Sequence, residues 1–327
     1  MRRSPVALAV LVAVALTASA CGSSSKSSDT SGPATTGGSG DSGGGAGGAT
    51  GILKAIDTSA ATGAQKLKLD LAVDVKGSPT NAQLALFTKQ PIDVAVDGVV
   101  DAGGKSADVN LSVTLGKDPI KAEIRTGGGT SWLQIDGKWY DLPADALSST
   151  TGQSLPAGVS ADNLDAGKIL AAIGDPSKLL DNATVSSEKV EGIDSDKVSG
   201  DVNITAAAQA VAKLSATTGS TSAAPSQAQI DKSVAELKKV LKKAHVDIWV
   251  GKSDHKVHRL AFNADAAMDD ATKTSSGIDS LDLSLDVTTV DASAPDVSAP
   301  SSVGTAAELQ TALIGLLGKV MGGAATG

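Results

Sequence analysis

Apolar and polar residues alternate strictly over residues 67–75 and 109–115, where every second side chain is Leu or Val. A period of two places successive side chains on opposite faces of a β-strand, so both segments are predicted strands with one buried and one wet face. Further segments follow the same rule. The other predicted strands are 92–100, 120–125, 132–135, 138–140, 184–190, 197–202, 246–250, 257–263 and 281–290.

Turn signals separate these strands and favour antiparallel hairpins. Asp136-Gly137 is a two-residue turn signal between 132–135 and 138–140, and further hairpins are predicted around Gly192 and residues 252–255. Gly127-Gly-Gly129 lies between two predicted strands rather than before a helix, so we interpret it as a bend and not as a phosphate-binding loop.

Elsewhere the apolar spacing changes to that of helices. Ser226 with Gln229 forms a capping box, followed by one apolar stripe at Ile230, Val234, Leu237, Leu241 and Ala244. Cap residues and spacing also predict helices at 165–173, 178–183, 204–214 and 305–321.

At least eight antiparallel strands interrupted by helices predict an α+β domain, in which helices cover one face of a large curved sheet. Residues 69–75 and 281–287 have nearly the same sequence, which indicates an early and a late strand with one inside/outside pattern in the same sheet. The space between the sheet and its helices could hold an apolar ligand.

The first residues have the features of an exported lipoprotein. Arg2 and Arg3 precede an apolar run, and small residues 17–20 lead directly into Cys21, the only cysteine. The apolar stretch is too short to span a bilayer, so we expect residues 1–20 to be a cleaved signal peptide and Cys21 to carry acyl chains. Ordinary cleavage beside a chance cysteine is the alternative, because Ala18 stands where the commonest lipobox has leucine.

Residues 22–50 consist almost wholly of small and polar residues, which predicts a disordered tether with a reach of about 30 Å. The expected organisation is a signal peptide (1–20), the lipidated cysteine and tether (21–50), one α+β domain (51–300) with a flexible insert at 215–226, and a C-terminal apolar-faced helix (301–327).

The amino-acid composition limits the kinds of partner that we expect this protein to bind. Without Arg2 and Arg3, 26 of the 28 basic residues remain against 36 acidic ones, so nucleic acid is not an expected partner. Aromatic residues make up 2% of the chain. A core of small aliphatic side chains is compatible with a cavity lined by methyl groups, although the base composition of a genome can produce the same bias.

The sequence contains no catalytic or metal-binding motif that we recognise, and we expect neither an enzyme nor a cofactor. His245, His255 and His258 are interpreted as a solvated hairpin rather than metal ligands, and Asp282 and Asp286 as the wet side of a strand. Five lysines make one predicted helix locally basic, which fits either a solvated face or contact with anionic headgroups. They are Lys232, Lys238, Lys239, Lys242 and Lys243.

A series of short motifs resembles the actinobacterial LppX/LprG lipoprotein family over residues 50–295. The series begins with the lipobox, the tether and a short helix near 52–56, and continues with Gly-Lys-Trp-Tyr140, Leu155-Pro-Ala-Gly158, Ile173-Gly-Asp-Pro-Ser-Lys-Leu-Leu180, Val246-Asp-Ile-Trp-Val250 and Val257-His-Arg-Leu260. The resemblance implies a half-barrel like that of the LolA/LolB carriers, with a cavity for acyl chains of glycolipids or other apolar lipids. It carries over no catalytic residue and assigns no ligand-binding residue.

The resulting hypothesis is a monomeric lipoprotein at the extracytoplasmic face of the cell membrane that binds or carries an apolar lipid, with an envelope transporter as a candidate partner. The alternative is a lipoprotein with a filled core that serves protein interaction or envelope scaffolding, and an exported hydrolase is the third reading. A cavity of several hundred cubic ångströms would favour the first over the second.

Overall fold

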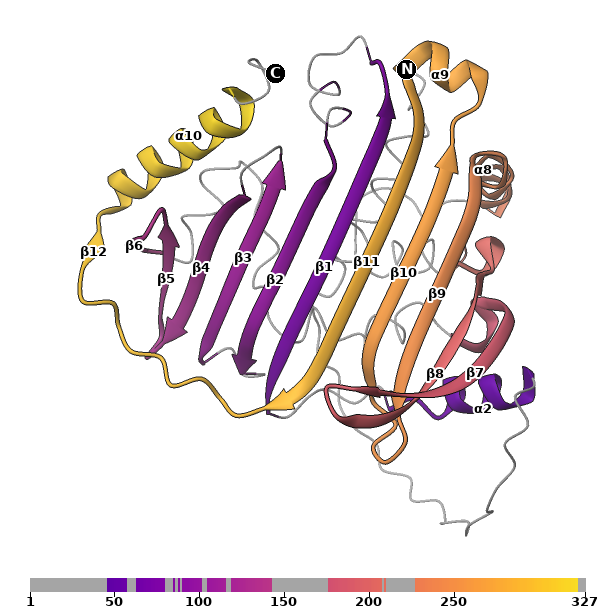
Figure 1. Cartoon of the computed structure of the whole chain (residues 1–327), viewed down its shortest axis with the longest axis horizontal. Coiled ribbons are helices and arrows are strands. Elements are labelled where there is room, and N and C mark those ends of the chain that lie inside the picture. Colours follow the sequence, from indigo (N-terminus) through magenta and orange to yellow (C-terminus); the bar gives the residue numbers. More distant parts are fainter. Residues whose placement is uncertain are drawn as a thin grey trace.

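The computed structural model describes residues 46–57, 63–79, 85, 88, 90–101, 105–115, 119–142, 176–207, 209 and 227–322. They form an α+β fold dominated by one twelve-stranded sheet (Figure 1). The elements in chain order are α2 (Ala46–Lys54), β1 (Ala64–Gly77), β2 (Ile92–Asp101), β3 (Ala107–Leu115), β4 (Pro119–Gly127), β5 (Thr130–Ile135), β6 (Lys138–Asp141), the 3₁₀ turn η1 (Pro176–Lys178), β7 (Leu180–Val190), β8 (Ile193–Val202), α8 (Gln227–Val240), β9 (Leu241–Gly251), β10 (Val257–Ala267), α9 (Asp270–Ser276), β11 (Ile278–Ala292), β12 (Val303–Gly304) and α10 (Ala306–Gly322).

The sheet joins two meanders at its centre. Its strand order is β12-β6-β5-β4-β3-β2-β1-β11-β10-β9-β8-β7, and every pair is antiparallel except β12 with β6. The junction is β1 against β11, where Leu69 faces Val287 and Leu71 faces Leu285. The two nearly identical segments predicted to share one sheet are therefore direct neighbours.

All the predicted strands are present, and most are longer than predicted. The Asp136-Gly137 turn is confirmed, because both residues have positive φ angles of 50° and 80°, as a type I′ hairpin turn requires. Gly128 and Gly129 likewise connect β4 to β5 with φ angles of 60° and 82°, which confirms the bend.

Two helix predictions need correction because sheet pairing determines the conformation. The helix predicted over 178–183 is wrong: η1 makes a single turn and β7 starts at Leu180, which pairs with Val202 of β8. The helix that follows residue 226 ends at Val240, and Leu241 already begins β9. Ala244 therefore faces Ala264 of β10 instead of extending the helical stripe.

The N-terminal helix also begins earlier than composition suggests. α2 starts at Ala46, so the last five residues of the predicted tether, 46–50, belong to the folded part. Ala49 and Leu53 are 1% and 2% exposed, because both pack against the β7–β10 end of the sheet. Burial of these two side chains stabilises a helix that its Gly-rich sequence alone disfavours.

Two elements have no counterpart among the predictions. α9 has no apolar periodicity and is defined by its ends, with the Asp269 side chain accepting from Thr272 N and Gly277 closing the helix at a φ of 71°. β12 has only two residues and pairs in parallel with β6. The predicted helix at 165–173 and the insert at 215–226 lie outside the described residues, as does part of 204–214, of which 204–207 and 209 are helical.

α10 confirms the predicted C-terminal helix and begins with a capping box. Glu308 Oε2 accepts from Thr305 N at 2.7 Å, and Glu308 N donates to Thr305 Oγ1 at 3.3 Å. Lys138 on β6 donates to the same carboxylate at 2.6 Å. Lys138 and the Thr305 groups lower the pKa of Glu308 from its ordinary 4.5 to about 2.

Replacing Glu308 by glutamine is expected to speed amide hydrogen exchange over residues 305–309. Because the pKa of Glu308 is lowered in the folded state, its contribution is fully present above about 4.5 and is lost as the pH falls toward about 2. The difference between wild type and variant should therefore disappear across that window. Glu236→Gln, which removes an exposed pair with Lys239 on α8, is the control and should leave exchange in α10 unchanged.

Candidate functional site

One face of the sheet is apolar from strand to strand. On this face Leu71 of β1 lies between Leu285 of β11 and Val94 of β2. The register continues outward, because Val94 faces Val113 of β3 and Leu285 faces Phe262 of β10. We call the central part of this surface the apolar face; it comprises Leu69, Leu71, Val73, Val94, Val96, Leu111, Val113, Phe262, Ala264, Leu283, Leu285 and Val287.

The middle of the apolar face is only half-buried. Near the start of β1, Leu67 is 2% exposed, and Val287 opposite Leu69 is 4% exposed. Farther along the same strands, Leu71, Val73 and Leu285 are all partly accessible to solvent. Side chains at the centre of a filled core are close-packed on all sides, so this part of the sheet retains methyl surface that the protein does not fully cover.

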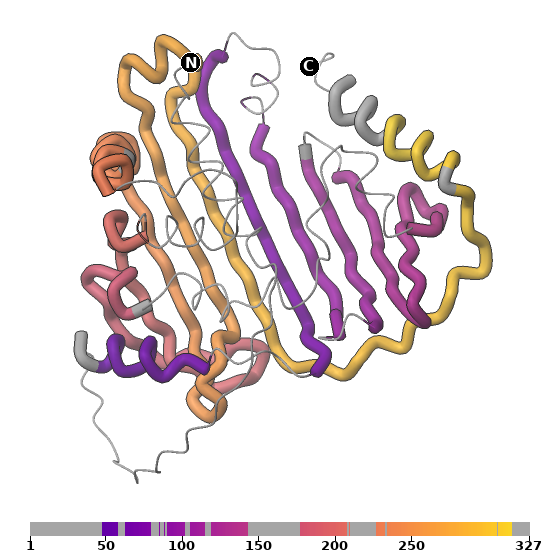
Figure 2. Tube along the Cα trace, turned by 180° about the vertical axis from the view of Figure 1, so that it is seen from behind, coloured from indigo at the N-terminus to yellow at the C-terminus, as the bar shows by residue number. Residues whose placement is uncertain are grey.

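Both ends of the sheet are closed by helices on this side. α2 packs Leu53 against Val198, Ile248 and their neighbours on β7–β10, and α10 packs Leu309 against Leu133 and its neighbours on β5 and β6. Figure 2 shows α2 and α10 at opposite ends of the sheet. The described buried residues form five separate clusters rather than one continuous core. In the middle of the sheet, the half-buried Leu71 and Leu285 pack against the small cluster of Leu67, Leu69 and Val287.

The opposite face of the sheet is polar and carries Asp282 and Asp286, the two acids that the sequence places on the wet side of a strand. Asp282 binds Lys76 at 2.9 Å, and Asp286 accepts two hydrogen bonds from Arg259 Nε at 3.0 and 3.1 Å. These contacts confirm that both acids lie on the wet side of the strand. Arg259 also stacks on the ring of Trp249, with 4.5 Å between the guanidinium carbon and the ring centre.

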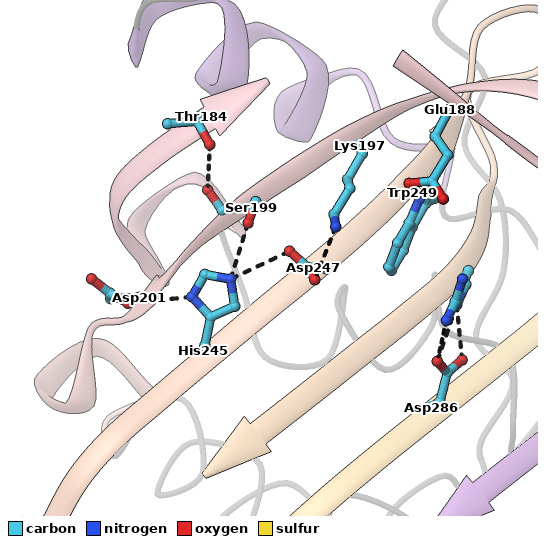
Figure 3. Close-up of polar contacts among 10 residues, drawn as sticks. Thr184, Glu188, Lys197, Ser199, Asp201, His245, Asp247, Trp249 and Asp286 are labelled. Atoms are coloured by element: carbon cyan, nitrogen blue, oxygen red, sulfur yellow. Dashed lines mark hydrogen bonds and ion pairs between the residues drawn. The ribbon is translucent and has the colours of Figure 1, made fainter. Parts of the chain in front are cut away.

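A second polar network surrounds His245 on β9 (Figure 3). His245 Nε2 lies 3.0 Å from Ser199 Oγ, and Nδ1 lies 3.3 Å from Asp201 Oδ1. The hydrogen bond with His245, followed by that from Asn182, lowers the pKa of Asp201 below its ordinary value. On the other side, His245 Nε2 lies 3.4 Å from Asp247 Oδ1.

Ser, His and Asp are the residue types of a hydrolase triad, but their setting on the sheet does not suit that chemistry. Ser199 lies within β8 and pairs with Thr184 on β7 and Asp247 on β9, so its backbone groups belong to the sheet ladder. An acyl-transfer site needs free N–H donors for a developing oxyanion, and the carboxylate of Asp247 would repel that charge. We interpret the network as a cross-strand polar contact.

The three histidines have separate partners. His255 lies in the β9–β10 turn with a φ of 55°, and His258 is buried with Nε2 3.0 Å from Asp254 and Nδ1 3.3 Å from Thr289 O. The side chain of His245 contacts Ser199, Asp201 and Asp247, as described above. Within the described ranges, no group of three or more His, Cys, Asp or Glu residues could hold a metal ion.

The predicted basic residues are divided between two elements. Lys232, Lys238 and Lys239 lie on α8, and Lys242 and Lys243 lie near the start of β9. All five are exposed. Cys21, the one predicted modification site, lies outside the described residues.

The half-buried condition of the apolar face was not predictable from the sequence. Alternation identified the side chains of one face, but the degree to which other segments cover them depends on contacts made far along the chain. The resemblance indicated a short helix near 52–56, but the first residues of α2, 46–50, are typical of a linker, so its packing against the sheet was not predicted.

Comparisons with known proteins give likenesses to solved structures only. No protein-family model and no curated protein matches the sequence. Among solved structures, the chain is similar to the crystal structure of LprF from Mycobacterium bovis, with 16% sequence identity and a TM-score of 0.35 over 79% of this chain and 98% of that one.

None of the helices in the described part of the chain is long and apolar enough to cross a bilayer.

Proposed function

We propose that this protein is a membrane-anchored extracytoplasmic lipoprotein that binds the acyl chains of an apolar lipid or glycolipid on the apolar face. The observation that carries the proposal is the half-burial of Leu71, Val73 and Leu285 at the centre of a twelve-stranded sheet whose ends are closed. Aliphatic side chains without nearby polar groups favour methylene chains over polar ligands.

Lipid binding would remove from water the apolar surface that remains exposed in the free protein. Each methylene group that leaves water contributes about 0.8 kcal/mol, so ten methylenes of an acyl chain would contribute about 8 kcal/mol before the cost of ordering is subtracted. The same contact would complete the burial of the aliphatic side chains on the sheet. A protein with such a surface is more stable with a lipid bound than without one.

The sequence supports the anchoring part of the proposal. Residues 1–20 would direct export, acyl chains on Cys21 would hold the protein at the cell membrane, and a tether would end where α2 begins at Ala46. The 24 residues from 22 to 45 would have an average reach of about 25–30 Å. In this proposal the protein is a monomeric carrier without an enzymatic role, and an envelope transporter is its candidate protein partner.

A second candidate function is a protein-interaction or scaffolding module. It is favoured by the sheet edge that carries β12 and α10, where Val303 and Ile314 are 37% and 66% exposed. Exposed large apolar side chains on neighbouring elements are common where a partner protein binds. In this case the apolar face would bind no lipid.

The test is native mass spectrometry with lipid extraction on a soluble form that begins at residue 21 and carries Cys21→Ser. This form retains all of α2, which a truncation at residue 51 would cut. Co-purified lipid that is lost on delipidation and regained on mixing would support the carrier. A protein that stays free of lipid after challenge with glycolipids and acylglycerols would favour the interaction module instead.

The proposed acyl anchor on Cys21 predicts in which cell fraction the protein is found. In the full-length chain, Cys21→Ser should move the protein from the membrane fraction to the soluble fraction, because two or more acyl chains are needed for stable attachment. Ser23→Ala, two residues away, is the control and should leave the protein in the membrane fraction. Retention of Cys21→Ser at the membrane would show that another part of the chain provides the attachment.

A further inference from the structure

A polar pocket lies near one end of the sheet, away from the middle of the apolar face. It has a volume of about 440 Å³ and opens where β7 begins and β8 ends, beside α8. Its polar walls include Lys178, Asn203, Thr205, Gln209 and Lys238. This volume is typical of sites for small ligands or for the headgroup of a larger one.

The wall of this pocket carries more positive than negative charge. Lys178 comes from η1 and Lys238 from α8, two elements that are far apart in the sequence. Asp181 is the acidic lining residue, and its Oδ1 accepts a hydrogen bond from Asn203 Nδ2 at 3.1 Å. The other lysines of this segment, Lys239, Lys242 and Lys243, do not line the pocket.

Asn203 gives the pocket a fixed wall. Its backbone N donates to Leu179 O at 2.7 Å, and its side-chain Oδ1 accepts from Ala206 N at 3.0 Å. Thr205 and Gln209 add a hydroxyl and an amide to the lysine ammonium groups. Ammonium, hydroxyl and amide donors around one space are the groups that bind phosphate oxygens.

Apolar side chains also contribute to the wall of the pocket. Val202 lines the pocket and pairs with Leu180, which belongs to the same buried cluster as Ile248. A ligand that fills the pocket would therefore contact the lysines as well as apolar groups such as Val202. This combination is found in lipids with a phosphate headgroup.

We propose that this pocket binds a phosphate group, and that in a lipid ligand this group is the headgroup phosphate. The inference rests on the proposed lipid-binding function for the source of the phosphate, but the phosphate chemistry of the pocket itself does not depend on it. It gives the protein a preference for anionic phospholipids over uncharged acylglycerols with the same acyl chains.

The test compares a double variant, Lys178→Gln with Lys238→Gln, with the matched control Lys232→Gln with Lys242→Gln. Both change the charge by the same amount at exposed positions, but only the first pair lines the pocket. Binding of fluorescent phosphatidylglycerol and of diacylglycerol with the same chains is measured for each. Wild type and control should prefer phosphatidylglycerol by about tenfold, and the pocket variant should lose this preference while diacylglycerol binding changes by less than about twofold.

Inorganic phosphate and glycerol 3-phosphate provide the second arm. Saturable amide shifts at residues 203–206 that are absent in the pocket variant would support the phosphate site even if no lipid binds, and would identify a free phosphate compound as its source. In that case only the proposed lipid-binding function would fail. If neither phosphate compound shifts these amides and phosphatidylglycerol is not preferred over diacylglycerol, the phosphate site is wrong.

Discussion

Replacing Leu285 by lysine is expected to lower the affinity for an acyl-chain ligand by at least about tenfold while the sheet stays folded. Leu285 lies at the centre of the apolar face, between Leu71 and Phe262, and is half-buried. The change removes a branched aliphatic contact and brings an ammonium group beside the acyl chain. Loss of the contact and incomplete solvation of the charge together cost about 2–3 kcal/mol of binding free energy.

The folded state should tolerate this lysine better than the complex does. Because Leu285 is accessible in the free protein, the flexible stem of a lysine can lie along the sheet and keep its ammonium group in water. A bound acyl chain would remove that access. The effect is therefore expected in binding rather than in the melting temperature.

Ser284→Lys is the matched control because Ser284 is the preceding residue of β11 and points to the opposite face. Ser284 is exposed and faces Asn263 and Ala72 in the sheet. Displacement of a fluorescent fatty acid should give wild-type affinity for Ser284→Lys. If Leu285→Lys also binds with wild-type affinity, acyl chains do not lie on the apolar face.

The strands could be predicted because their pattern is local and strict. In β1 and β11 every second residue is apolar over seven or more positions, and no other regular structure has this period. The similarity of 69–75 and 281–287 even indicated that the two strands share a sheet. Their direct pairing followed only from the structure, because a pattern of faces does not specify which edges meet.

The helix boundaries were less predictable because they depend on distant contacts. Leu241 continues the apolar stripe of α8 by its spacing, but it packs beside Ala266 and Ile278 and belongs to β9. Leu180 likewise pairs with Val202 in the sheet, although the sequence predicts a helix over 178–183. In both cases strand pairing outweighs a local preference of less than about 1 kcal/mol per residue.

The candidate sites could not be predicted from the sequence, because they too depend on contacts between distant segments. Which apolar side chains of the sheet remain half-exposed is decided by the positions of α2 and α10, and α2 has the composition of a linker. The phosphate pocket is lined by both Lys178 and Lys238, which lie far apart in the sequence. The lysine-rich segment was visible in the sequence, but its pairing with η1 was not.

Replacing Ile248 by alanine is expected to lower the free energy of unfolding by about 2–5 kcal/mol. Ile248 is 1% exposed on β9, where it pairs with Val198 of β8 and Leu260 of β10 and belongs to the cluster that includes Leu53 of α2. Alanine would leave a cavity at a point where three strands and a helix meet. Urea denaturation of the soluble Cys21→Ser form would measure the change.

The comparison variant is Ile314→Ala on α10, which removes the same atoms from a side chain that is 66% exposed and should change stability by less than about 0.5 kcal/mol. Ile248 lies in the end of the sheet that α2 closes, so Ile248→Ala should retain the lipid-binding capacity that Leu285→Lys loses. A loss of stability below about 1 kcal/mol would instead mean that α2 does not pack tightly on β7–β10. If Ile248→Ala and Leu285→Lys both behave as expected, stability resides in the end of the sheet that α2 closes, and ligand binding in its half-buried middle.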